Sequence, residues 1–227
     1  TSEQYTELKQ KMLKSVYQNG GFYIGKYETG IEDKPKTSGS STTAPEEIPV
    51  IKQNAYPYNY VTCSQAQILA NSMESGKYTS SLMFGVQWDL VLKYLETKGT
   101  AQADLKTNSI NWGNYYDNLW NITNENSKYS KVYDSTWTTG AYGVKASSLS
   151  ILLSTGSSDT FSKQGIYDIA GNVWEWTLEY NTSNSSRPCA KRGGIYNDFG
   201  SGSPAAARNK NATTSFSISI GFRVVLY

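Results

Sequence analysis

The sequence contains no histidine, and this absence excludes several kinds of catalytic and metal site. A Ser-His-Asp triad, a histidine metal ligand and a base that titrates near neutral pH all need an imidazole. Cysteine is scarce too, because only Cys63 and Cys189 are present and they form no CxxC motif. Their separation argues against a zinc or thioredoxin-type site, and it leaves open either one disulfide or two unreactive thiols.

Charge and hydrophobicity give no reason to expect a nucleic acid or a membrane as partner. The 21 Lys and Arg residues against 19 Asp and Glu give a net charge of +2, far from the strongly basic surface that binds anionic polymers or lipids. No run approaches the ~20 apolar residues of a membrane helix, so we expect no membrane insertion. The 227 residues suffice for one large domain or two small ones. The start at Thr1, without an apolar leader, suggests a fragment whose native compartment cannot be assigned.

Tyrosine, by contrast, is abundant, with 18 residues beside six tryptophans. Both side chains bring large, fairly rigid amphipathic area and are favoured in binding surfaces. A loop-rich soluble domain also accumulates tyrosine, so composition alone leaves both interpretations open.

Helical periodicity is confined to the first hundred residues. Apolar residues from Tyr5 to Tyr17 recur at helical spacing and are followed by a glycine C-cap, which predicts an N-terminal helix over residues 1–19. A second helix is expected after Val61, capped by Thr62 or Ser64. A third should run from Val86 to Leu95 and end at Gly99. The inward face expected for the second helix consists of Ala66, Ile68, Leu69 and Met73.

After Ala101 the helical period disappears and short strand patterns take its place. Such patterns cover residues 21–28, 165–169, 173–178 and 221–226. Residues 32–49, rich in Pro, Ser and Thr, read as a loop. Two or three helices followed by a loop-rich β region predict an α+β fold, with the helix over 1–19 preceding a single domain over 20–227.

Several motifs carry a family resemblance when they are taken in order. They are GGFYIGKYE at 20–28, GIYDIAGNVWEW at 165–176, Arg192-Gly193-Gly194, and Gly221-Phe222-Arg223-Val224. This set resembles the formylglycine-generating-enzyme (sulfatase-modifying factor) domain family. The resemblance implies a C-type-lectin-like fold, with two to three helices around a small antiparallel sheet and long irregular loops.

The catalytic residues of that family are not found at their usual place. Its oxidases use two cysteines shortly after the RGG element to handle copper and oxygen, and soft thiolates suit Cu(I). Residues 195–202 contain no cysteine. We therefore expect a non-enzymatic member without a cofactor. A copper-dependent oxidase built from Cys63 and Cys189 is the less favoured alternative.

Some members of the family hold a structural calcium ion at the GNVWEW segment. By resemblance, Asp168 and Glu175 would supply the side-chain ligands, together with backbone carbonyls, since Ca²⁺ prefers oxygen. The favoured alternative is that Glu175 pairs with Arg192 or Arg223 in the core.

Residues 195–219, here called the variable span, have an unusual composition. Ser, Ala, Asn, Gly and Thr dominate the span, while Glu, Gln, Met and Trp are absent. Small polar residues mixed with aromatic ones are typical of an adaptable paratope. The pattern resembles the variable region, here about 192–227, of proteins diversified by retroelements through adenine-directed mutagenesis. The residues expected to face a ligand are Ile195, Tyr196, Asn197, Asp198, Phe199, Ser201, Ser203, Ala206, Ala207, Asn209, Asn211, Ser215, Phe216 and Ser217.

This second resemblance implies a binding role. The expected partner is a protein or other macromolecule on a host or neighbouring cell, recognised from a phage tail (virion) or a bacterial cell surface. An ordinary Ser/Asn-rich loop and a structural tail or decoration protein are the alternatives, and homo-oligomer formation is left open. Lys210 does not fit the codon pattern of such variation.

Overall fold

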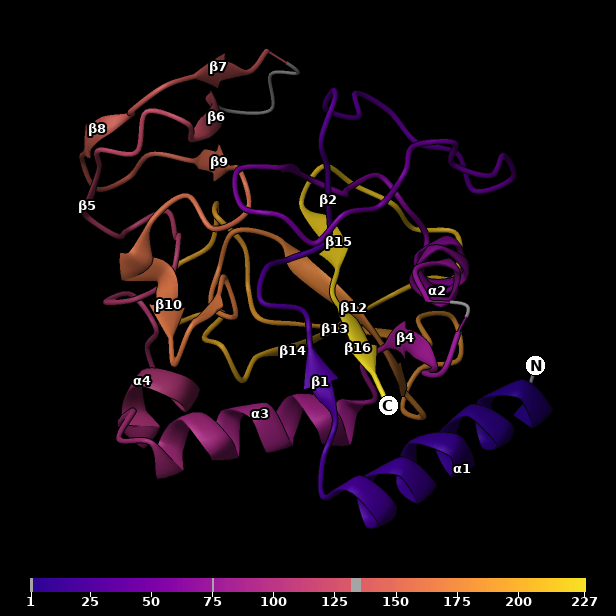
Figure 1. Ribbon diagram of the computed structural model, residues 1–227. Helices are drawn as coiled ribbons and strands as arrows, with labels where there is room; N and C mark the ends of the chain where they lie inside the picture. Colours follow the sequence, from indigo (N-terminus) through magenta and orange to yellow (C-terminus); the bar gives the residue numbers. More distant parts are fainter. Residues whose placement is uncertain (1, 75, 132–135) are drawn as a thin grey trace.

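The computed structural model describes residues 2–74, 76–131 and 136–227 (Figure 1). Its helices are α1 (Ser2–Asn19), α2 (Cys63–Ser72), α3 (Gly85–Thr97), α4 (Gln102–Lys106) and the 3-10 turn η1 (Asp159–Phe161). Its strands are β1 (Tyr23–Ile24), β2 (Gly30–Ile31), β3 (Tyr56–Pro57), β4 (Ser80–Leu82), β5 (Trp120–Ile122), β6 (Lys128–Lys131), β7 (Thr138–Thr139), β8 (Gly143–Lys145), β9 (Ile151–Leu153), β10 (Ser162–Lys163), β11 (Ile166–Tyr167), β12 (Trp174–Tyr180), β13 (Cys189–Arg192), β14 (Arg208–Asn211), β15 (Ile220–Phe222) and β16 (Val224–Leu226).

The three predicted helices are confirmed as α1, α2 and α3. At the start of α2, Thr62 accepts a hydrogen bond from the backbone N–H of Gln65, and the Gln65 side chain accepts one from the backbone of Thr62. This reciprocal capping box satisfies two donors that a helix start otherwise leaves unpaired. Gly99 follows α3 with φ +99°, a conformation that suits glycine after a helix.

Two helical details differ from the expectation. Ile68 was expected to face the core but is 68% exposed, because α2 buries the stripe formed by Gln65, Ala66, Leu69 and Ala70. The helix α4 was not anticipated, because five residues are too few to show a helical period.

The largest sheet has the strand order β14-β13-β12-β15 and carries the RGG element at the end of β13. β13 is antiparallel to both β12 and β14, but β15 lies parallel to β12. The expected antiparallel pairing thus holds for the other strand pairs of this sheet, and the β12–β15 pair is the exception. The long connection between β12 and β15 provides the crossover that parallel strands require.

The predicted strand over 221–226 is divided between two sheets. β15 pairs with β12, whereas β16 pairs with β1 on one side and β4 on the other. Arg223 lies at the junction between them. The C-terminal segment therefore joins the two sheets, as its position in the middle of Figure 1 shows.

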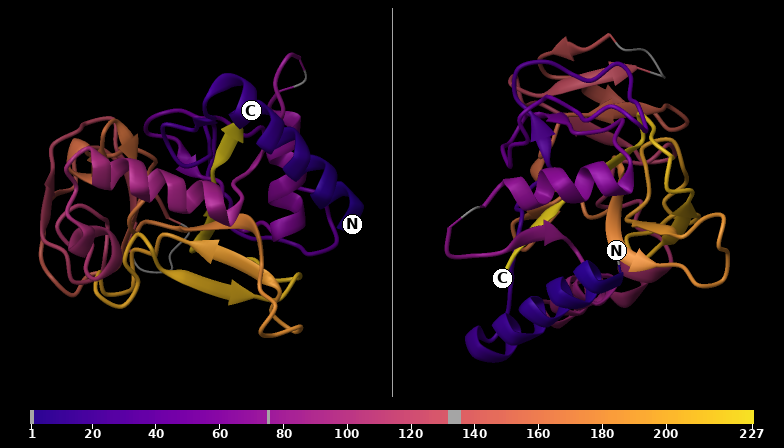
Figure 2. Two further views of the ribbon diagram at one scale, coloured as in Figure 1. Left: turned by 90° about the horizontal axis from the view of Figure 1, so that it is seen from below. Right: turned by 90° about the vertical axis from the view of Figure 1, so that its right-hand side faces the viewer.

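Apolar side chains pack on both sides of β12. One cluster joins α2 to Trp174, Trp176 and Phe222, and the other joins α3 to Trp112 and to Met12 of α1. Figure 2 (left) shows α3 running alongside the orange and yellow strands of the main sheet. Within the described residues, no helix combines the length and apolar character needed to cross a bilayer.

Candidate ligand-binding surface

Three of the fourteen residues expected to face a ligand are buried. Ile195 and Ser203 are each 8% exposed, and Tyr196 is 1% exposed. The ring of Tyr196 packs in a cluster with Leu152 and Val173. The prediction is wrong for these three residues, because composition identifies a loop but not which of its side chains turn inward.

The other candidates reach the surface to different extents. The four exposed ones are Phe199, Ser201, Asn209 and Phe216, of which Phe199 is 55% exposed. The half-buried ones are Asn197, Asp198, Ala206, Ala207, Asn211, Ser215 and Ser217. We call the four exposed side chains the outer set.

Backbone atoms of the variable span are bonded to residues outside it. The main-chain hydrogen bonds run from Tyr116 N to Asp198 O (2.9 Å), from Ser109 N to Gly200 O (3.1 Å), from Ala206 N to Leu105 O (2.9 Å) and from Tyr60 N to Ser217 O (3.0 Å). None of these bonds uses a side chain of the span. The path of the loop is therefore compatible with many sequences at the exposed positions.

The segment 115–118 is the principal support of the first half of the variable span. The ring of Tyr116 meets Phe199 edge-on at 5.6 Å between centroids, and Asp117 accepts a hydrogen bond from Gly200 N at 3.0 Å. Segment 115–118 is itself held by the fully buried Lys145, whose Nζ donates to the carbonyls of Tyr115, Tyr116 and Asn118 at 2.7–3.0 Å. Sequence reasoning missed these partners, because no local motif links positions so far apart.

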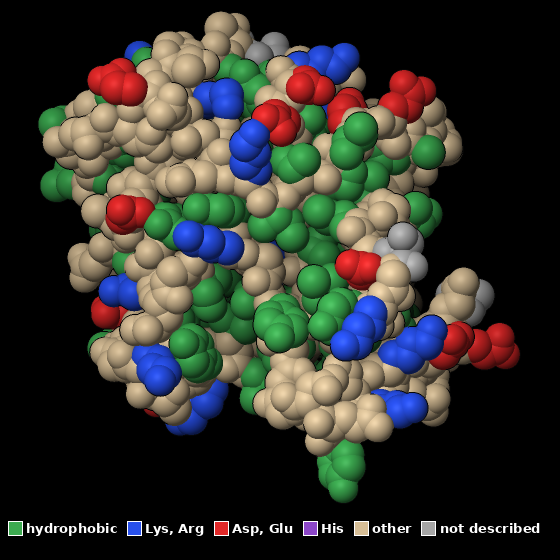
Figure 3. All heavy atoms as spheres, in the orientation of Figure 1, with side chains coloured by type: hydrophobic (Ala, Val, Ile, Leu, Met, Phe, Trp, Pro, Cys, Tyr) green, Lys and Arg blue, Asp and Glu red, His purple; other side chains and the backbone are tan. Residues whose placement is uncertain are grey.

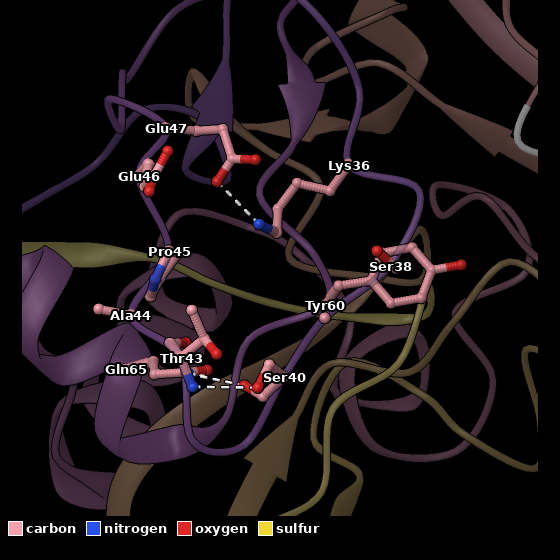
Figure 4. A pocket seen from close by; sticks show the side chains of 11 residues that line it. Lys36, Ser38, Ser40, Thr43, Ala44, Pro45, Glu46, Glu47, Tyr60 and Gln65 are labelled. Carbon is pink, nitrogen blue, oxygen red and sulfur yellow. Dashed lines mark hydrogen bonds and ion pairs between the residues drawn. The ribbon is translucent and has the colours of Figure 1, made fainter.

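The second half of the variable span lies against the loop that the sequence assigned to residues 32–49. A Cβ atom added at Gly39 would lie 2.4 Å from Tyr60 O and 2.8 Å from the ring of Phe216, so only glycine fits there. This loop surrounds a polar cavity of about 290 Å³, in which Lys36 and Glu47 form an ion pair of 2.7 Å (Figure 4). Phe216 thus packs against the loop over residues 32–49.

Charges of both signs are interspersed on the face of the molecule that Figure 3 shows. On that face, the described Lys and Arg residues form no large area separate from the Asp and Glu residues.

The residues considered for calcium belong to a buried charge cluster. Arg223 donates to both oxygens of Glu175 at 2.7–3.1 Å, and both side chains are buried. Asp168 accepts a hydrogen bond from Gly156 N at 2.7 Å. Within the described ranges, no group of three or more Cys, Asp or Glu residues is arranged to hold a metal ion. Glu175 is therefore paired with Arg223, and calcium binding stays a prediction.

This cluster predicts a pH dependence of stability. Burial raises the pKa of Asp168 to about 7, from about 4 in an unfolded chain. The folded state therefore binds this proton more tightly, and Asp168 contributes stability below about pH 4 that is lost as the pH rises through 7. Asp168→Asn abolishes this titration and keeps an oxygen for Gly156 N–H. Relative to the wild type, the variant should gain stability between pH 5 and pH 8 in urea unfolding. A stability difference between variant and wild type that stays the same from pH 5 to pH 8 would contradict the assignment.

The model of the sulfatase-modifying factor enzyme 1-like domain matches residues 2–227. The chain belongs to this family. The predicted α+β, C-type-lectin-like and formylglycine-generating-enzyme-like fold class is confirmed, and the match includes α1. The sulfatase-modifying factor domain family includes enzymes, so membership alone assigns no activity. No curated protein matches the chain.

Solved structures show more distant similarity to this sulfatase-modifying factor domain. Variable protein 1 of Treponema denticola is 18% identical, with a TM-score of 0.37, over 67% of this chain and 49% of that one. The structure of CarF is 18% identical, with a TM-score of 0.43, over 74% of this chain and 66% of that one. The present chain thus spans about half of the first protein and just under two thirds of the second.

Proposed function

We propose that this sulfatase-modifying factor domain is a non-enzymatic binding protein. Its outer set, Phe199, Ser201, Asn209 and Phe216, would contact a macromolecule on a host or neighbouring cell. The observation that carries the proposal is the main-chain anchoring of the variable span to residues outside it. A surface of this kind can change its side chains while the loop keeps its course, since exposed substitutions usually alter stability by about 0.5 kcal/mol or less.

The chemistry of the outer set suits recognition by contact. Phe199 is exposed and supported from the side by Tyr116, which is the arrangement of an aromatic anchor held in one orientation. Ser201 and Asn209 are also exposed and add short hydrogen-bonding groups to the outer set. The cysteine-free stretch 195–202 supports a binding role over an oxidase role, because the two thiolates that the family's oxidases use are missing there.

Within this proposal, the protein is the variable protein of a diversity-generating retroelement. The absence of Glu, Gln, Met and Trp from the variable span supports this finer assignment. The test is genomic. We expect an imperfect repeat of the codons for residues 192–227 beside a reverse-transcriptase gene. A complete flanking sequence without either feature overturns the assignment to a retroelement, but leaves the binding role to be tested separately.

The binding role is tested with labelled full-length chain on a panel of intact bacterial cells. Binding to at least one strain should fall about tenfold or more for Phe199→Ala, since a lost aromatic anchor costs about 1.4 kcal/mol or more. The matched control is Tyr17→Ala, an exposed aromatic on α1 outside the outer set. Equal losses of cell binding in Phe199→Ala and Tyr17→Ala would contradict the proposal. A structural tail protein would instead show self-assembly in solution mass measurements that depends on Phe199.

A stability comparison checks the division between outer and buried positions. Tyr196→Ala should destabilise the protein by about 3 kcal/mol, because it leaves a cavity beside Leu152 and Val173. Phe199→Ala should cost about 1 kcal/mol or less, because the ring contacts mainly Tyr116. Urea unfolding of both variants measures the difference. Similar losses would mean that Phe199 belongs to the core and not to a surface open to variation.

A further inference from the structure

The two cysteines, which the proposed function does not use, lie together on one cavity wall. Cys63 is the first residue of α2 and Cys189 the first residue of β13, and neither forms a disulfide in this structure. Both line a cavity of about 840 Å³, whose other residues come from α1, from the start of α3, from β12, and from Pro188 and Arg208 next to β13 and in β14. Folding thus creates a dithiol that has direct access to a space large enough for a small molecule.

Hydrogen bonds fix both cysteines relative to β12. The Cys63 thiol donates to Thr177 O at 3.6 Å, and the Thr177 hydroxyl donates to Ala190 O at 3.1 Å, next to Cys189. The capping box of Thr62 sets the position of Cys63 on the helix. The two thiols lie close enough for each to shift the pKa of the other.

The two sulfurs are not chemically equivalent. Interaction with the neighbouring Cys63 thiol lowers the pKa of Cys189, whereas interaction with Cys189, together with burial, raises the pKa of Cys63 well above its usual value. Cys189 is therefore the thiol that ionises first, and a thiolate is the attacking species in thiol chemistry. Arg208, Asp89 and Glu179 also line the cavity, so polar groups of both signs are available to a charged small molecule.

We propose that Cys63 and Cys189 form a thiol–disulfide exchange site that accepts a low-molecular-weight disulfide and closes into an intramolecular bond. Cys189 loses its proton and attacks one sulfur of the external disulfide, whose S–S bond breaks as a mixed disulfide forms. Cys63 then loses its proton and attacks the Cys189 sulfur, which releases the second small thiolate. The two released protons convert both leaving groups to thiols. The protein is oxidised by two electrons and the external disulfide is reduced by two.

This bond would tie α2 to the sheet that carries the variable span. Cys189 pairs with Asn211 of β14, and β13 leads directly into the RGG element. Oxidation would therefore fasten the base of the binding surface without touching the outer set. The exchange site is independent of the binding role, and either proposal can fail alone.

The test uses the full chain, reduced and then treated with oxidised glutathione at pH 8. We expect both thiols to disappear, and peptide mass mapping to find one cross-link between the peptides that contain Cys63 and Cys189. Two separate glutathione adducts without a cross-link, or disulfide-linked dimers, would overturn the proposal. This measurement needs no variant and so does not depend on the folding of one.

Single variants then test the order of attack. Cys63→Ser should trap glutathione on Cys189 as a stable adduct, because the resolving thiol is missing. Cys189→Ser should react at least about tenfold more slowly at Cys63, because burial still raises the pKa of that thiol after Cys189 is removed. Equal rates in the two variants, each checked for folding by circular dichroism, would contradict the assignment of Cys189 as the attacking residue.

Discussion

Arg223→Met is expected to destabilise the protein by about 5 kcal/mol, because it leaves a buried carboxylate without its partner. The guanidinium donates to both oxygens of Glu175 and to the carbonyls of Gly25 and Tyr167. All of these bonds lie in the interior, where Arg223 is 1% exposed. Methionine fills a similar volume but donates none of them. Urea unfolding at pH 7 measures the loss, and Arg187→Met, at an exposed position, is the matched control.

The same variant should respond to pH in a defined direction. Burial raises the pKa of Glu28 and Glu175, and Arg223 opposes that rise for both. Removing the cation raises these pKa values further, so the folded variant binds protons more tightly than the folded wild type. Its stability deficit should therefore shrink as the pH falls from 7 to 5. A deficit under 1 kcal/mol, or one independent of pH, would contradict the role given to Arg223.

Lys145→Met is expected to destabilise the protein by about 4 kcal/mol and to loosen the outer set. The variant leaves the buried carbonyl oxygens of Tyr115 and Asn118 without the donor that Lys145 provides, and each such group costs about 1–3 kcal/mol. The carbonyl of Tyr116 keeps the backbone N–H groups of Ser148 and Leu149 as donors. Burial lowers the pKa of Lys145 to about 8, so the side chain is still protonated at pH 7. The lost donor is therefore a charged one, whose hydrogen bonds are stronger than neutral ones.

The effect on the binding surface follows from the contacts of segment 115–118. Gly200 N–H donates to Asp117, so its hydrogen exchange should accelerate in Lys145→Met under conditions in which the protein stays folded. The amide of Arg192, in the main sheet, should keep its protection and serves as the internal reference. Lys93→Met, at an exposed ion pair on α3, is the control variant and should change stability by about 0.5 kcal/mol or less. An unchanged exchange rate at Gly200 would mean that Lys145 does not support the outer set.

Local signals accounted for the predictions that were confirmed. The start of α2 could be located because Thr62 and Gln65 are three residues apart and cap one another. The strand β12 could be located because Trp174 and Trp176 are two positions apart, the spacing at which side chains of a strand share one face. Both tryptophans pack in one apolar cluster. By contrast, β14 has the sequence Arg208–Asn211, which is polar throughout and becomes a strand only by pairing with β13.

The sequence alone determined three features of this protein, because each is a property of the chain and not of its folding. They are the lack of histidine and scarcity of cysteine, the small-residue composition of 195–219, and the order of the motifs that mark the family. Tertiary structure decided the rest. It turned Tyr196 inward and left Phe199 outside, paired Glu175 with Arg223, bonded Lys145 to segment 115–118 and brought Cys63 and Cys189 to one cavity. These outcomes depend on contacts between residues far apart in the chain, whose side chains face each other only once the sheets and helices have packed.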